Sequence, residues 1–392
     1  MSDRPVDRAH LRPSRIATIP GDGVGPEVVA AARLVVDAAT ERFRFDVEWS
    51  EHAAGGNAID RYGVAIRDED VAACGAADAI LLGACGGPKW DNPKATVRPE
   101  QALFKLRGAL GLFANLRPVT VHPTIGASAA PIRPELLRGV DMLFVRELTG
   151  GLYFGVRTEA TGEVGERHAS DTLPYSEAEI SRVVRLAFEL ARGRRRRLTS
   201  VDKANVLATS RLWRTIVEEM KPEFPDVEVG HQLVDSCAML LVKQPAWFDV
   251  LVTENLFGDI LSDEAGVLAG SLGMLPSASL GERRTAHGTF GLYEPIHGSA
   301  PDIAGQDKAN PIGTILSAAM LLRLSLSRAD AAEAVEAAVA STLDAGWRTG
   351  DIAAAGGPDE RLRVVGTQAF AGAVVEALAA GAVAMAAASV PA

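Results

Sequence analysis

The sequence predicts an α/β protein with a largely parallel sheet, because apolar β-branched runs alternate with longer segments of helical periodicity. The predicted strands span 15–20, 79–83, 142–146, 198–202, 227–234, 249–253 and 292–295. Apolar residues at helical spacing mark 26–41, 177–192, 210–220 and 311–324. Strands that alternate with helices are typical of crossover connections between parallel strands. The length of 392 residues allows one to three domains.

The composition excludes several classes of protein. Hydrophobic residues make up 47% and charged residues 23% of the chain, so a disordered or fibrous protein is excluded. The net charge of −10 argues against nucleic acid or an anionic membrane as the main partner. A run of five arginines at 192–197 is explained better by a solvated helix end than by polyanion binding.

The ends of the chain and the cysteines favour a cytoplasmic protein. Neither end resembles a signal or transit peptide, and the alanine-rich tail at 377–392 is too short for a membrane span. Three scattered cysteines without a CxxC pair exclude a disulfide framework and suit a reducing compartment.

Two glycine-containing turns are candidate ligand loops. The turn at 19–27 (IPGDGVGPE) leads from a predicted strand into a helix, but its glycines lack the GxGxxG spacing of dinucleotide folds. An ordinary strand-to-helix turn explains it equally well. The turn at 294–302 (EPIHGSAPD) is rich in small residues, which let a backbone approach a nucleotide closely.

Three arginines and a lysine stand at positions where a ligand would explain their charge. Arg146 ends an apolar strand, where an unpaired charge is costly, and Arg107 and Arg117 lie in or after apolar segments. Three guanidinium groups can hold a dicarboxylate, although internal salt bridges explain the pattern equally well. Lys203 follows an apolar strand and is a candidate general base, with a lysine on the rim of the site as the alternative.

Two aspartates four residues apart indicate a divalent metal. In a helix, Asp259 and Asp263 would lie about 5–6 Å apart on one face, where their charges repel unless a cation binds. Oxygen ligands suit Mg²⁺ or Mn²⁺. Asp235, after another predicted strand, is a candidate third ligand, and an exposed acidic face is the alternative interpretation.

Together these segments resemble the β-decarboxylating dehydrogenases, the isocitrate and isopropylmalate dehydrogenase family. The resemblance covers about residues 15–375 and is carried by 19–27, 81–90, 112–118, 145–155, 200–205, 257–263 and 293–305. It implies a two-domain α/β fold that is distinct from the Rossmann fold. The first, cofactor-side domain would combine 1–112 with 270–392, and the second, 113–269, would also form the interface of a homodimer.

The resemblance also implies a role for each candidate residue. Arg107, Arg117 and Arg146 would bind the carboxylates of the substrate. Tyr153 would be the general acid that protonates the enol carbon, and Lys203 of the partner subunit would take the hydroxyl proton.

The metal and cofactor sites follow from the same resemblance. Asp235 of the partner subunit would contact the substrate and join Asp259 and Asp263 at Mg²⁺ or Mn²⁺. NAD is expected rather than NADP, because the acidic Asp302 and the apolar Ile303 stand where a 2′-phosphate would lie. The residues that would hold the adenosine half are His297, Gly298, Ser299, Ala300, Pro301, Asp302, Ile303 and Asn310.

The implied activity is NAD-dependent oxidative decarboxylation of 3-isopropylmalate to 4-methyl-2-oxopentanoate and CO₂, a step of leucine biosynthesis. Glu100, Leu103, Phe104 and Val206 would face the group on C3 of the substrate. Leu103 and Phe104 suit an isopropyl group better than the third carboxylate of isocitrate. Phe104 stands where relatives usually have a smaller aliphatic residue, so a D-malate- or tartrate-type substrate remains an alternative. A catalytically silent regulatory subunit is a further alternative, although every implied catalytic group is present.

Overall fold

The computed structural model describes residues 12–92, 95–126, 129–353 and 362–388, which form two compact units. Unit 1 combines the chain up to Gly111 with most of the chain from Pro276 onward, and unit 2 spans Leu112–Leu275. The sequence expectation placed these divisions at 112/113 and 269/270.

Unit 1 contains five sheet strands in the order β2-β1-β3-β12-β11. Neighbouring strands are parallel except for the antiparallel pair β11 and β12. The strands are β1 (Ser14–Gly21), β2 (Val47–Glu51), β3 (Ala79–Ala84), β11 (Pro276–Arg284) and β12 (Thr289–Pro295), with a separate short pair β13 (Trp347–Arg348) and β14 (Arg363–Val364).

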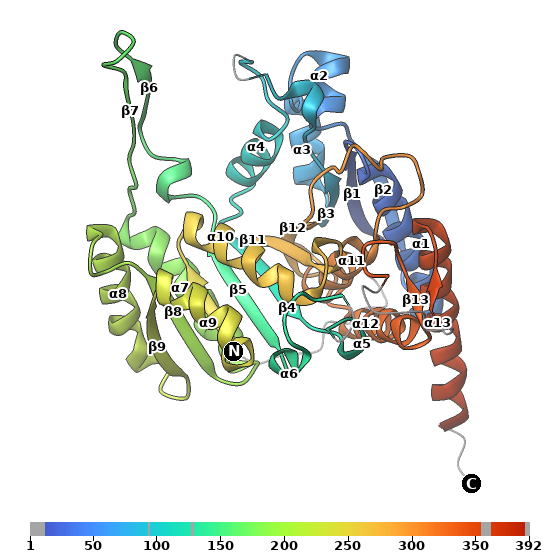
Figure 1. Ribbon diagram of the computed structural model, residues 1–392. Coiled ribbons are helices and arrows are strands. Elements are labelled where there is room, and N and C mark those ends of the chain that lie inside the picture. Colours follow the sequence, from blue (N-terminus) through green and yellow to red (C-terminus); the bar gives the residue numbers. More distant parts are fainter. Residues whose placement is uncertain (1–11, 93–94, 127–128, 354–361, 389–392) are drawn as a thin grey trace. The chain divides into compact units, whose positions relative to one another are not determined.

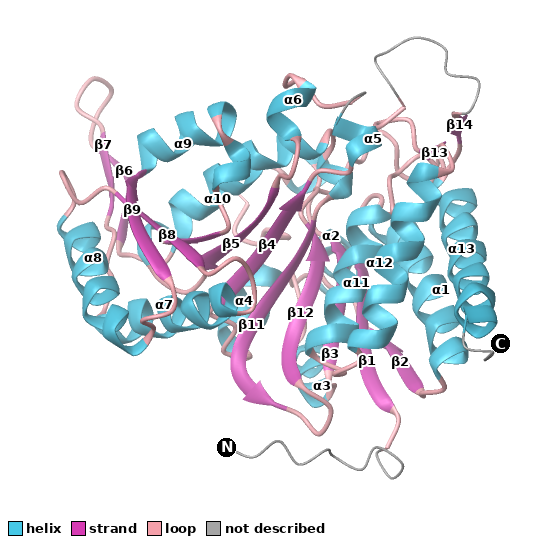
Figure 2. Cartoon of the chain, turned by 90° about the horizontal axis from the view of Figure 1, so that it is seen from below, coloured by secondary structure: helices cyan, strands magenta, loops and turns pink. Residues whose placement is uncertain are grey.

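Helices cover the sheet of unit 1 in two layers on one side. Figure 2 shows α1 (Gly25–Phe43) and α11 (Ile312–Leu324) against the strands, with α12 (Ala329–Asp344) and α13 (Thr367–Ala388) next to them. The remaining helices are α2 (Gly56–Tyr62), α3 (Asp68–Ala76), η2 (Pro88–Trp90) and α4 (Gln101–Ala109). No helix among the described residues is long and apolar enough to cross a membrane.

Unit 2 contains five sheet strands in the order β4-β5-β10-β8-β9, of which only β4 and β5 pair antiparallel. Its strands are β4 (Ala114–Thr120), β5 (Asp141–Glu147), β8 (Arg197–Asp202), β9 (Glu228–Leu233) and β10 (Val250–Thr253). A two-stranded arm, β6 (Arg157–Thr161) and β7 (His168–Asp171), extends from the unit (Figure 1), and every residue of its strands is exposed.

Helices cover both faces of the sheet of unit 2. Figure 2 shows α7 (Glu177–Arg192) and α8 (Ala208–Met220) on one face, and α9 (Val234–Lys243) and α10 (Asn255–Gly266) on the other. Short turns complete the unit: α5 (Pro123–Gly126), α6 (Pro134–Leu137), η3 (Gly151–Tyr153), η4 (Lys221–Glu223), η5 (Pro245–Trp247), η6 (Val267–Ala269) and η7 (Leu272–Met274).

Local sequence explains where α7 begins. The side chain of Ser176 accepts a hydrogen bond from the backbone N–H of Glu179, and Glu179 accepts one from the backbone of Ser176, so a capping box starts α7. Its apolar residues, Ile180 and Phe188 among them, are buried on one face. The α/β prediction is confirmed, and each of the seven predicted strands and four predicted helices is present.

Three of the ten sheet strands, β2, β4 and β11, and both strands of the arm were not predicted. In β11, Ser277 and Ser279 are buried, and the Ser277 hydroxyl donates to the backbone oxygen of Glu294 at 2.9 Å. Strand β4 carries Arg117, and β2 is an edge strand with polar residues. Polar residues that are buried through hydrogen bonds give no apolar pattern, so sequence periodicity does not reveal these strands.

The arginine-rich segment at 192–197 is ion-paired within unit 2 and is not merely solvated. Arg192 contacts the carboxylate of Asp226 at 2.6 Å. Arg194 contacts Asp141 at 2.8 Å and Asp249 at 2.9 Å. The Asp249 side chain is fully buried at the start of β10, so these arginines neutralise a charge that the fold places inside the protein.

Replacing Arg194 with alanine is expected to lower the free energy of unfolding by about 2 kcal/mol, because the buried Asp249 loses its nearest counter-charge. Urea denaturation followed by circular dichroism measures the loss. Arg192→Ala is the matched control, since its partner Asp226 lies at the surface, and its effect should be much smaller. Equal losses in the two variants would contradict the role given to Asp249.

Candidate functional site

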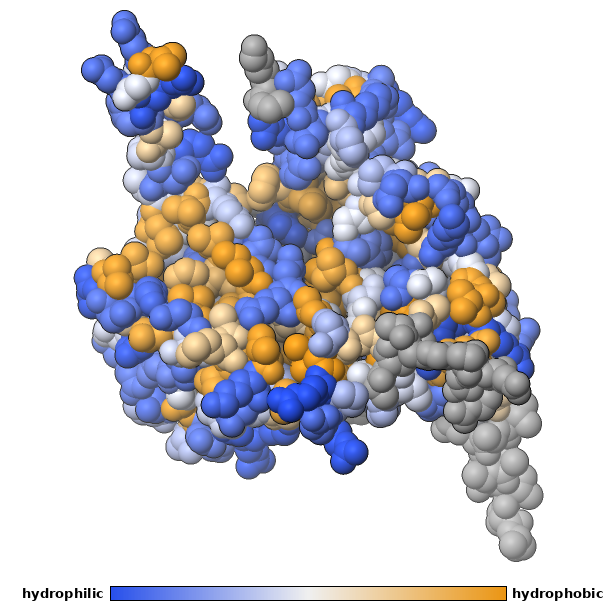
Figure 3. Space-filling model, viewed as in Figure 1, coloured by the Kyte–Doolittle hydropathy of each residue, from blue (hydrophilic) through white to orange (hydrophobic). Residues whose placement is uncertain are grey.

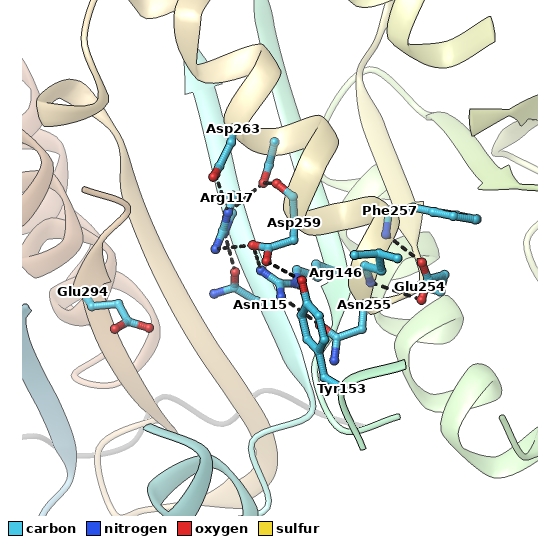
Figure 4. A network of polar contacts seen from close by, with 12 residues as sticks. Asn115, Arg117, Arg146, Tyr153, Glu254, Asn255, Phe257, Asp259, Asp263 and Glu294 are labelled. Atoms are coloured by element: carbon cyan, nitrogen blue, oxygen red, sulfur yellow. Dashed lines mark hydrogen bonds and ion pairs between the residues drawn. The ribbon is translucent and has the colours of Figure 1, made fainter. Parts of the chain in front are cut away.

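Unit 2 brings five of the predicted site residues together from neighbouring elements. Arg117 lies in β4, Arg146 lies in β5, and Tyr153 ends the turn η3. Asp259 and Asp263 lie one helical turn apart on α10, whose residues pack against β4 and β5. Figure 4 shows these side chains directed toward one another.

Asp259 is the centre of this cluster. One of its carboxylate oxygens forms an ion pair with Arg146 and lies 3.4 Å from Arg117. Its other oxygen accepts a hydrogen bond from the Tyr153 hydroxyl at 3.0 Å. Arg117 also contacts Asp263 at 2.9 Å. The sequence left ligand binding and internal salt bridges open for these arginines, and within the chain both of them pair with the aspartates.

The electrostatics of the cluster favour a protonated Tyr153. Burial raises the pKa of the phenol, and the negative charge of Asp259 raises it further. Burial also raises the pKa of Asp263, opposed by the guanidinium of Arg117. Tyr153 therefore keeps its proton at neutral pH and is suited to donate it.

Lys203 and Asp235 form a second group in unit 2. The Lys203 amine donates to the Asp235 carboxylate at 2.8 Å, and this hydrogen bond lowers the pKa of Asp235. Among the described residues, neither side chain forms a hydrogen bond or ion pair with the Tyr153 cluster of the same chain. Val206 follows nearby in the chain and is exposed.

The donor chemistry of α10 fits a divalent cation. Asp259 and Asp263 offer carboxylate oxygens, which Mg²⁺ and Mn²⁺ prefer. Within the described part of the chain, no three His, Cys, Asp or Glu side chains gather as a metal site. Asp259 and Asp263 are the two carboxylates that α10 could offer to such a cation.

Unit 1 holds the other predicted substrate residues on or beside α4. Arg107, near the end of α4, contacts Glu294 at 2.7 Å, and its Nε atom is buried with no hydrogen-bond partner among the described residues. Glu100 precedes the first turn of α4, Leu103 is partly exposed, and Phe104 is exposed. An unsatisfied guanidinium N–H of this kind fits an anionic ligand.

The two glycine-containing turns of the sequence meet in unit 1. The backbone N–H of Val24 donates to the Ser299 oxygen at 2.8 Å, and a Cβ at Gly23 would lie 1.9 Å from that oxygen. Ala300 and Ile303 pack against a buried cluster that includes Val24. The close approach requires glycine at position 23, which also has a positive φ of 59°.

The loop after β12 presents groups that fit a nucleotide. The Nε2 atom of His297 is buried without a partner among the described residues, and burial lowers the pKa of its imidazole. The side chain of Asn310 donates to Asp351 at 3.0 Å. Gly298, Pro301 and Asp302 are exposed in the same loop, and Ser299 is buried.

Three polar residues behind the Tyr153 cluster were not predicted. Glu147, Tyr175 and Glu254 form a buried or partly buried network next to Arg146 and η3. The sequence offered one signal for two of these residues, namely that they adjoin predicted site elements. Glu147 directly follows Arg146, and Glu254 directly precedes α10. Their connection through Tyr175 depends on the tertiary fold.

Comparison with known proteins agrees with this geometry. The family model described as isocitrate/isopropylmalate dehydrogenase matches residues 15–374. The chain is 53% identical to a 3-isopropylmalate dehydrogenase of Pseudomonas fluorescens, covering 93% of this chain and 98% of the relative. It is 56% identical to a 3-isopropylmalate dehydrogenase of Anaeromyxobacter dehalogenans, covering 86% and 94%.

Solved structures give the same result. An isocitrate dehydrogenase from Methylococcus capsulatus matches with a TM-score of 0.79 and 34% identity, covering 93% of this chain and 99% of that one. A β-decarboxylating dehydrogenase from Thermococcus kodakarensis matches with a TM-score of 0.73 and 36% identity, covering 94% and 96%. The chain belongs to the isocitrate/isopropylmalate dehydrogenase family.

Proposed function

We propose that this enzyme is an NAD-dependent 3-isopropylmalate dehydrogenase that converts (2R,3S)-3-isopropylmalate to 4-methyl-2-oxopentanoate and CO₂ in leucine biosynthesis. The observation that carries the proposal is the cluster of Tyr153, Asp259 and Arg146, in which a protonated phenol lies beside a carboxylate and a guanidinium. Relatives more than half identical to this chain bear that enzyme name.

The arginines of the chain bind and orient the substrate. Arg117 and Arg146 present guanidinium groups that are almost fully buried, and such groups bind carboxylates strongly through charge-assisted hydrogen bonds. Arg107 has a further N–H group without a partner among the described residues. A substrate held by several guanidinium groups loses most of its orientational freedom before it reacts.

Proton transfer needs one base and one acid. Lys203 of the partner subunit takes the proton of the substrate hydroxyl, and Tyr153 donates its phenol proton to the enol carbon after CO₂ has left. Because burial and Asp259 raise the pKa of Tyr153, the phenol enters this step in its protonated form.

Metal and cofactor supply the rest of the chemistry. Asp259 and Asp263, with Asp235 of the partner subunit, would hold Mg²⁺ or Mn²⁺, which stabilises negative charge on the substrate oxygen when it is bound. The loop with His297, Asp302 and neighbouring residues would hold NAD, which would supply a hydride acceptor for C2 of the substrate. Asp302 is exposed in that loop, where a carboxylate accepts ribose hydroxyls and repels a 2′-phosphate.

A homodimer explains two exposed features of unit 2. Helices α9 and α10 expose large apolar side chains, with Met239 at 67% and Ile260 at 58% exposure, and Figure 3 shows apolar surface in this region. The β6–β7 arm carries Val164, which is 86% exposed, and a two-stranded hairpin alone is barely stable in water. A second copy that covers these surfaces would also bring its own Lys203 and Asp235 to the site.

Isopropylmalate should exceed D-malate in kcat/KM, because burial of three extra carbons contributes about 2 kcal/mol, or roughly 30-fold. NADH formation with isopropylmalate, D-malate and isocitrate, measured side by side with Mg²⁺, tests this order. A preference for D-malate would move the assignment to the D-malate or tartrate type, in agreement with the bulk of Phe104, and leave the family unchanged.

NAD⁺ should be strongly preferred over NADP⁺, and Asp302→Lys combined with Ile303→Tyr should shift the preference toward NADP⁺ by supplying donors to the 2′-phosphate. The ratio of kcat/KM for the two cofactors is the measurement. Equal use of both cofactors by the wild-type enzyme would contradict the role given to Asp302.

Mixed dimers test whether Lys203 and Tyr153 of one site come from different chains. Lys203→Ala and Tyr153→Phe homodimers should both be nearly inactive. In the mixed dimer one site is complete and the other carries both changes, so a 1:1 mixture unfolded and reassembled should recover roughly a quarter of wild-type activity. Verified mixed dimers without recovery would show that both residues serve the site of one chain.

A further inference from the structure

Tyr175 lies directly behind the turn that carries Tyr153. It follows the β6–β7 arm and precedes α7, and its ring packs against Gly150 and Gly151. A Cβ atom at Gly150 would lie 2.6 Å from the Tyr175 ring, and one at Gly151 would lie 2.7 Å from its hydroxyl. The ring therefore fixes how closely the turn η3 approaches the core of unit 2.

The Tyr175 hydroxyl connects two segments of the site. It accepts a hydrogen bond from the backbone N–H of Asn255 at 3.0 Å, which is the first residue of α10. It donates toward Glu147 at 3.2 Å and lies 3.5 Å from an oxygen of Glu254. One hydroxyl thus joins the end of β5 to the start of the helix that carries Asp259.

Each residue that Tyr175 contacts holds part of the catalytic cluster. The Glu147 carboxylate accepts from the backbone N–H groups of Thr149 and Gly150, both at 2.8 Å, and so fixes the approach to η3. The Asn255 side chain accepts from Arg146 at 2.8 and 3.0 Å and donates to the Gly150 oxygen at 3.1 Å.

The start of α10 depends on the same network. The Glu254 carboxylate accepts from the backbone N–H groups of Phe257 at 2.6 Å and Leu256 at 3.1 Å, which caps the helix. Burial raises the pKa of Glu254, and burial together with Glu147 and Glu254 raises the pKa of Tyr175. Tyr175 therefore remains a neutral donor between two carboxylates, and an ionised tyrosinate is excluded there.

We propose that Tyr175 is a positioning residue for the proton-donating step. Its hydroxyl holds the turn that carries Tyr153 at a fixed position relative to the start of α10, the helix that carries Asp259. In this arrangement the Tyr153 hydroxyl lies 3.0 Å from Asp259. The inference rests on the proposed role of Tyr153 as the acid. Among the described residues, Tyr175 forms no hydrogen bond with Tyr153 or Asp259. It therefore acts through the backbone of the two segments that carry them, the turn η3 and the start of α10.

Tyr175→Phe removes only the hydroxyl and should lower kcat about tenfold, because loss of the bond to Asn255 loosens the geometry of the acid. The KM for NAD⁺ should stay unchanged. Tyr293→Phe is the matched control: its hydroxyl lies 2.7 Å from Ser325 in unit 1, so the variant loses a buried hydrogen bond that is not part of the Tyr153 cluster. The control should keep its kcat, and thermal melting shows whether both variants are folded.

A double-mutant cycle separates positioning from general damage. If Tyr175 acts through Tyr153, adding Tyr175→Phe to Tyr153→Phe should change the residual rate by less than twofold. Glu147→Gln, which keeps the side-chain size, should show the same pattern as a second variant. A tenfold loss in both backgrounds, or an unchanged kcat in Tyr175→Phe, would overturn the proposal.

Wild-type turnover is measured first, so that a failure of the proposed substrate can be told apart from a failure of the positioning role of Tyr175. Absence of NADH formation from isopropylmalate would remove the proposed substrate, and the cycle would then use whichever of D-malate and isocitrate is turned over. Normal turnover of isopropylmalate that Tyr175→Phe leaves unchanged would remove only the positioning role of Tyr175.

Discussion

The ion pair between Arg146 and Asp259 is the constraint on which the site depends. Arg146 is 5% exposed, so its charge requires a partner inside the protein. Asp259 supplies it from α10, which must therefore lie against β5, and this placement also brings Asp263 to Arg117 and Asp259 to the Tyr153 hydroxyl. A ligand of either charge therefore meets side chains that are already paired, while Asp259 and Asp263 remain partly exposed to solvent.

The elements that the sequence predicts are those with a strong apolar pattern. Strand β3 is buried along its whole length, and α7 buries one continuous face, so periodicity reveals both. Strands β4 and β11 contain polar residues that the sheet buries with hydrogen bonds, and the β6–β7 arm buries none of its strand residues. Their formation depends on neighbours distant in sequence, which local patterns do not contain.

The sequence likewise predicts some residues of the candidate site and misses others. Spacing alone places Asp259 and Asp263 on one helix face, and the structure confirms that they share α10. The residues alone left salt bridges and ligand binding open for the arginines, because the two require the same charge at the same place. Tyr175 and its partners were missed, since the hydroxyl meets Glu147 and Glu254 across 28 and 79 residues of chain.

The discontinuous path of the chain through unit 1 has a consequence for synthesis on the ribosome. Strands β1, β2 and β3 pair with one another, but β3 lacks its other neighbour, β12, until the chain of unit 2 has been completed. All strands of unit 2 lie within Leu112–Leu275 and emerge together, so this stretch can fold first, while β3 waits with an unpaired apolar edge. Protection of that edge in the nascent chain, by a chaperone or by slow collapse, is a requirement that the topology itself imposes.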